Sequence, residues 1–140
     1  LFTRPYPVGL LIDRVGPVVA NDAYAPPNVW RDFVRDAYHG PRVAWGREVN
    51  LFLLGAANRL SMAPQARIDQ RQRDAFAREL HESIAHVRAA VEASGFRSEL
   101  WSYEFPGGRL NPVRYGSGGD VQLWSTTDLV VQYTLSHLSR

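Results

Sequence analysis

The stretch RSELWSYEFPGGRLNPVRYGSGGDVQLWS, residues 97–125, decides the fold of this chain. Residues alternate from position 99 onward, so a strand here would have two distinct faces. One of these faces would set a carboxylate in an aromatic row: Glu99, Trp101, Tyr103 and Phe105. Residues 106–108, Pro-Gly-Gly, predict a turn, because proline restricts φ and glycine accepts positive φ. Residues 109–114 are therefore expected to return as the second strand of a β-hairpin.

The second half of this stretch predicts a turn followed by a helix. The glycine-rich residues 116–119 let the chain change direction, and Asp120 is a suitable N-cap for a helix over 121–139. Gln122 and Trp124 would lie in its first turn. A carboxylate, aromatic rings and a helix N-terminus brought together by a hairpin are the components of a polyol-binding site.

Hydrophobic spacing predicts helices in most of the remaining chain. A short helix is expected from Asn28 as its cap to about residue 37. A helix over 45–60 is expected to be buried on most sides, and one over 65–94 to be amphipathic, solvated on its outer face and ended by Gly95. Residues 1–24 contain several prolines and glycines, which favours irregular structure or short edge strands.

Composition limits the classes of function. The chain has 140 residues, 45% of them hydrophobic, which suits a single domain. Its net charge is only +2 and its 16 basic residues are all arginine, spread along the chain, so no nucleic-acid partner is expected. No apolar run is long enough to suggest a membrane partner. The absence of cysteine leaves the compartment open, with a cytoplasmic location favoured. The chain begins with leucine, which suggests a processed product or a piece of a longer protein.

No metal site is expected. His81 and His86 lie in the sequence HESIAH, but the histidines of a zinc-binding HExxH helix are four residues apart and share one face. Five residues apart, they diverge by about 140° around a helix with 3.6 residues per turn.

Three short motifs occur in an order that resembles a known family. They are Tyr38-His39-Gly40 followed by Trp45, then SELWSY at 98–103, and QLWS at 122–125. They are similar to segments of bacterial six-hairpin glycosidases, the (α/α)6 toroids that include glycogen-debranching-like glucosidases, trehalases and family 63 α-glucosidases. Residues 18–24, VVANDAY, are similar to a VVANPAY segment of the same family, with Asp22 in place of proline.

The resemblance implies a mainly α fold, with residues 1–140 as one domain that forms the C-terminal part of an incomplete (α/α)6 toroid and carries a short β-hairpin near 98–114. It also implies inverting hydrolysis of α-glucosidic bonds without a cofactor. In such enzymes the two carboxyl groups lie roughly 6.5–9.5 Å apart, which leaves room for the attacking water. Glu99 is the expected general base, with Glu104 and Asp120 as alternatives. The general acid would come from a missing region, so the isolated chain is expected to be inactive or to need the rest of the ring.

The residues expected to bind the sugar are His39, Trp45, Trp101, Gln122 and Trp124. Each also has an ordinary structural interpretation: the tryptophans as packing residues, His39 as a loop residue and Gln122 as a cap. Glu99 is otherwise a solvated residue or an ion-pair partner of Arg97 or Arg109. The expected partners are an oligo- or polysaccharide and either the rest of the ring or a second copy. The alternative function is a non-catalytic helical module that binds carbohydrate or protein.

Overall fold

The computed structural model describes residues 2–21, 23–36, 40, 42–62, 69–116, 119, 129, 131–133 and 135–136. The elements in chain order are β1 (Leu11–Ile12), β2 (Gly16–Pro17), α1 (Pro27–Arg35), β3 (Ala44–Trp45), α2 (Gly46–Ser61), α3 (Gln70–Ser94), β4 (Leu100–Glu104), a 3-10 turn (Pro106–Gly108) and β5 (Asn111–Arg114). Residues 131–133 and 135–136 are also helical.

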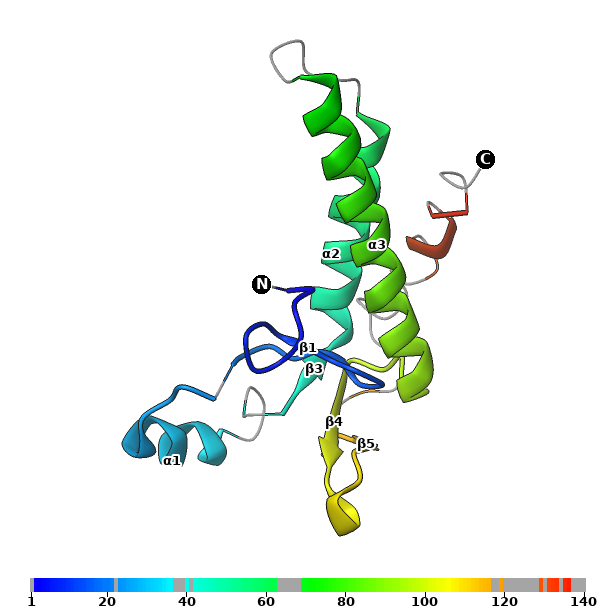
Figure 1. Ribbon diagram of the computed structural model, residues 1–140. Helices are drawn as coiled ribbons and strands as arrows, with labels where there is room; N and C mark the ends of the chain where they lie inside the picture. Colours follow the sequence, from blue (N-terminus) through cyan, green and yellow to red (C-terminus); the bar gives the residue numbers. More distant parts are fainter. Residues whose placement is uncertain are drawn as a thin grey trace.

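Helices α2 and α3 form a long antiparallel pair that dominates the molecule (Figure 1). Their buried residues recur every three or four positions, which places them along one face of each helix. These residues are Val49, Leu53, Ala56 and Ala57 on α2, and Ile84, Val87 and Ala90 on α3. Gly95 ends α3 in a left-handed conformation with φ of 74°, which confirms the stop expected there.

Two small antiparallel sheets lie at the lower half of this helix pair (Figure 1). β1 pairs with β2, and the second sheet has the order β3-β4-β5. β4 and β5 form the expected hairpin, and the turn between them places Gly107 and Gly108 at positive φ. The sequence did not predict β3. Trp45 was expected to begin the helix over 45–60, but Ala44 and Trp45 pair with β4 instead. The two sheets are joined by the amide of Val19, which donates to the carbonyl oxygen of Val43 at 2.8 Å.

The expected mainly α, incomplete (α/α)6 toroid is wrong. The described chain combines the α2 and α3 pair with two antiparallel sheets, and these sheets supply part of the hydrophobic core. Helix α2 is also less buried than expected, since Leu51 is 52% exposed and Leu54 is 37% exposed. The reason is that helical periodicity identifies which face of a helix is apolar, but not which neighbouring element covers it.

The N-terminal segment contributes more to the core than its composition suggests. Val15 and Val18 are fully buried, and Ile12 is nearly so. Their strands are short, as expected for residues 1–24, but β2 packs against α3 and β3. This segment therefore closes one side of the core at the lower part of α3.

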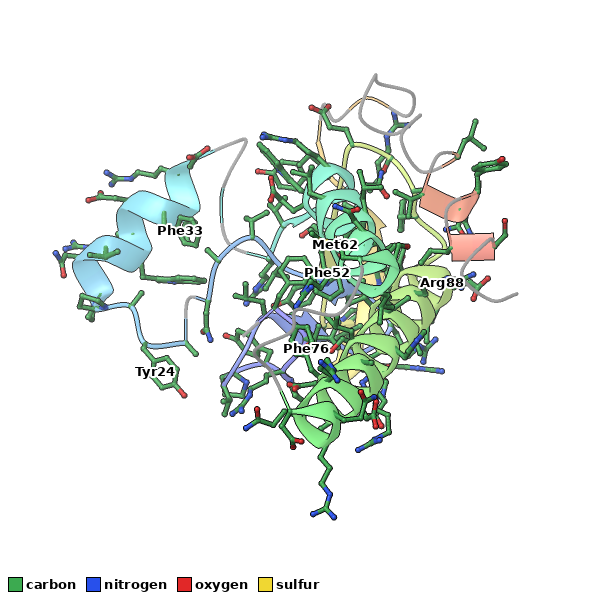
Figure 2. The ribbon with its side chains drawn as sticks, turned by 90° about the horizontal axis from the view of Figure 1, so that it is seen from above. Tyr24, Phe33, Phe52, Met62, Phe76 and Arg88 are labelled. Atoms are coloured by element: carbon green, nitrogen blue, oxygen red, sulfur yellow. The ribbon has the colours of Figure 1, made fainter. Side chains whose placement is uncertain are left out.

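Helix α1 stands apart from the rest of the described structure (Figure 1). Pro26 precedes it as the N-cap, so the helix begins before the cap expected at Asn28. None of its residues is buried. The ring centroid of Phe33, which Figure 2 labels on this helix, lies 6.4 Å from that of Trp30. Within the described ranges, no helix combines the length and apolar character needed to cross a bilayer.

Candidate functional site

Glu99 lies immediately before β4, where three segments of the chain meet. Its amide donates to the carbonyl oxygen of Gly119 at 3.1 Å, and its own carbonyl oxygen accepts from the amide of Gly46 at 3.0 Å. The carboxylate oxygen Oε2 accepts a hydrogen bond from the amide of Gly119 at 3.2 Å. The backbone of Glu99 is therefore held between the start of α2 and Gly119, and its side chain is bonded to Gly119.

Glu99 is only 6% exposed, and it is the one buried carboxylate in the part of the chain that the structure describes. Glutamate is rarely buried, because removing a charged group from water is costly unless hydrogen bonds compensate for it. Glu99 is therefore not a solvated strand residue, which was one interpretation of the sequence. Glu104, the first alternative base, is exposed at the far end of β4.

Trp101 is a core residue. Its ring has no exposed surface, and its Nε1–H donates to the carbonyl oxygen of Val15 at 2.7 Å. A sugar-stacking residue needs an accessible ring face, so the expected role of Trp101 in substrate binding is not compatible with this position. The alternative interpretation, a packing residue, is the one that agrees with the structure.

The other expected sugar-binding residues divide into two groups. Trp45 is half-buried in β3, opposite Leu100 of β4, and is thus one residue from the Gly46 amide that bonds Glu99. The remaining expected site residues, with the third candidate base, lie outside the described residues: His39, Asp120, Gln122 and Trp124. The structure thus brings the backbone of Glu99 close to that of Trp45 and to the start of α2, while the Trp45 side chain shares the sheet face of Leu100.

Gly46 lets β4 approach the start of α2. A Cβ atom at this position would lie 2.6 Å from the backbone oxygen of Ser98, closer than two such atoms can pack. We expect Gly46→Ala to lower the free energy of unfolding by about 1–3 kcal/mol, the usual cost of forcing an atom into a packed site. Urea unfolding followed by circular dichroism measures the change.

Gly55 provides the matched control on the same helix, because no atom lies within 4 Å of where its Cβ would be. Gly55→Ala is expected to raise the free energy of unfolding by about 0.5–1 kcal/mol, since alanine is the better helix former. Equal effects of the two substitutions would contradict the close approach at Gly46.

Tyr115, directly after β5, has a displaced pKa. Burial raises the pKa of its phenol, the negative charge of Asp36 raises it further, and a hydrogen bond with the Gly40 backbone partly opposes this. The raised pKa favours the neutral phenol of Tyr115. Its contacts connect the end of the hairpin to the segment that follows α1.

A pocket of about 470 Å³ lies between the N-terminal segment and the hairpin, and the sequence did not predict it. Arg14, Arg42 and Arg109 line it together with aromatic side chains. No sequence signal reveals this group, because the three arginines are far apart along the chain. A second cavity, of about 30 Å³, lies beside Trp101 between α2 and α3 and has room for only one or two water molecules. Arg88, which Figure 2 labels on α3, is one of the residues that line this cavity.

The described ranges contain no group of three histidine or acidic side chains that could hold a metal ion.

Comparisons of the chain with known protein families, with curated proteins and with solved structures found no match.

Proposed function

We propose that this chain supplies the general base of an inverting glycoside hydrolysis that acts on α-glucosides, and that Glu99 is this base. The observation that carries the proposal is the burial of this single carboxylate, oriented by the amide of Gly119. Carboxylates withdrawn from water and held in one orientation are typical of acid–base catalysis. The resemblance of residues 98–103 to a glycosidase motif indicates the same position.

In the proposed reaction, Glu99 accepts a proton from a water molecule while the water oxygen bonds to the anomeric carbon of the sugar. The bond from that carbon to the leaving oxygen breaks on the opposite face, and the configuration changes from α to β. A general acid supplied by another segment or chain protonates the leaving oxygen.

α-Glucosyl fluoride tests the proposal, because fluoride leaves without protonation and the base is then sufficient. The 140-residue protein is expected to release fluoride faster than buffer does and to produce β-glucose first, as followed by proton nuclear magnetic resonance. β-Glucosyl fluoride is the matched control and should be hydrolysed no faster than in buffer. A rate equal to that of buffer for both fluorides would overturn the proposed hydrolysis.

A further inference from the structure

A pocket outside the Glu99 site lies between the β1–β2 segment and the β4–β5 hairpin. Its volume of about 470 Å³ falls within the range of small-molecule sites. The side chains on which the inference depends are Tyr6, Arg14, Arg42, Tyr103, Phe105 and Arg109. We call this group, with Asp13, the arginine pocket.

The arginine pocket carries excess positive charge. Three arginines and Asp13 line it, and all four side chains are exposed. The ion pairs found in the described part of the chain, Arg35 with Asp32 and Arg47 with Glu48, involve none of them. Guanidinium groups present several N–H donors in a planar arrangement that matches the oxygens of a phosphate or a carboxylate. An oxyanion is therefore the group that this charge would attract.

Arg42 is held against two aromatic rings. Its guanidinium carbon lies 5.9 Å from the ring centroid of Tyr103 and 5.9 Å from that of Phe105. The two rings meet edge to face, with centroids 5.5 Å apart and an interplanar angle of 89°. Such cation–π contacts restrict the guanidinium group without using its hydrogen-bond donors. Phe105 is 51% exposed, so part of an apolar ring lies at the same place.

The backbone conformation gives a second, independent observation. Arg14 has φ of 62° and Arg42 has φ of 66°, and no other non-glycine residue in the described ranges has positive φ. A residue with a Cβ atom is disfavoured there, and glycine would remove the strain. Both strained residues are arginines and both line the same pocket. Backbone strain of this kind is concentrated at ligand sites and active sites, where the surrounding structure holds the strained conformation.

We propose that the arginine pocket binds a small molecule in which a phosphate or carboxylate is attached to a flat ring. The guanidinium groups of Arg14, Arg42 and Arg109 take the oxyanion, and the ring packs against Phe105 and its aromatic neighbours. The inference does not rest on the hydrolysis proposed for Glu99.

Calorimetric titration with four probes tests both parts of this ligand. Phenyl phosphate and benzoate each carry a ring and an oxyanion, inorganic phosphate lacks the ring, and phenol lacks the charge. At least one of the first two is expected to bind about tenfold or more tightly than inorganic phosphate and phenol. The comparison between phenyl phosphate and benzoate decides which oxyanion the pocket prefers. Equal affinity for all four probes, or no binding of either charged ring, would overturn the proposal.

Variants locate the binding. Arg42→Gln is expected to weaken binding of the preferred probe about tenfold or more, because it removes a charge-assisted contact. Arg14→Gly should also weaken binding while its melting temperature stays equal or rises, since glycine relieves the strained φ. Arg78→Gln removes the same charge from an exposed position of α3 outside the pocket and should leave binding unchanged. Wild-type affinity in Arg42→Gln and Arg14→Gly, or an equal loss in Arg78→Gln, would show that binding does not occur in the arginine pocket.

Discussion

Replacing Trp101 with alanine is expected to lower the free energy of unfolding by about 3–5 kcal/mol, the range found for large aromatic residues in packed cores. Trp101 is fully buried near the start of β4, and its indole N–H donates to the carbonyl oxygen of Val15 in the N-terminal segment at 2.7 Å. The substitution leaves a cavity and also an unbonded carbonyl oxygen at Val15. Because the whole stability of a small domain is about 5–15 kcal/mol, Trp101→Ala should remove a large share of it.

Urea unfolding followed by circular dichroism measures this change without depending on tryptophan fluorescence. Trp101→Phe keeps a buried ring but removes the hydrogen-bond donor, so it should cost less than Trp101→Ala and still at least about 1 kcal/mol. Trp30→Ala is the control of the same residue type, because Trp30 lies on α1, where no residue is buried. Equal losses in Trp30→Ala and Trp101→Ala would contradict the position of Trp101 in the core.

Glu99→Gln is expected to lower the rate of α-glucosyl fluoride hydrolysis by about 10²–10⁴-fold, the usual contribution of a general base. The amide has nearly the shape of the carboxylate, and its oxygen can still accept the hydrogen bond from Gly119, but it cannot take the proton from water. The melting temperature of Glu99→Gln should therefore stay close to that of the wild type. Loss of activity in a folded protein separates a catalytic function from a structural one.

Glu104→Gln is the matched control, since it changes an exposed carboxylate on the same strand. Its hydrolysis rate is expected to stay within about twofold of the wild-type rate. A general base must lie within hydrogen-bond reach of the proton that it takes, and in the proposed reaction that base is Glu99. If Glu99→Gln keeps full activity, Glu99 is not the base. A large loss in Glu104→Gln or Asp120→Asn would then assign the base to that residue.

Part of the candidate site was predictable from residues close together in sequence. Alternation and the Pro-Gly-Gly turn predicted the hairpin, whereas the role of Glu99 as a general base stays a prediction. The sequence predicted one face of β4 with Glu99 in a row of aromatic rings. The rings of Tyr103 and Phe105 do contact each other, but Trp101 is enclosed in the core. An alternating pattern defines two faces of a strand, but not which of them is covered.

The amino-acid sequence by itself determined the elements whose signals are local. These are α2, α3 and its stop at Gly95, and the hairpin of β4 and β5, because helical periodicity and turn residues act over a few positions. Only the tertiary structure decided that β3 is a strand, that Val15 pairs with Trp101 across 86 positions, and that three distant arginines share one pocket. Such contacts depend on how finished elements pack against one another, and short-range sequence patterns carry no record of that packing.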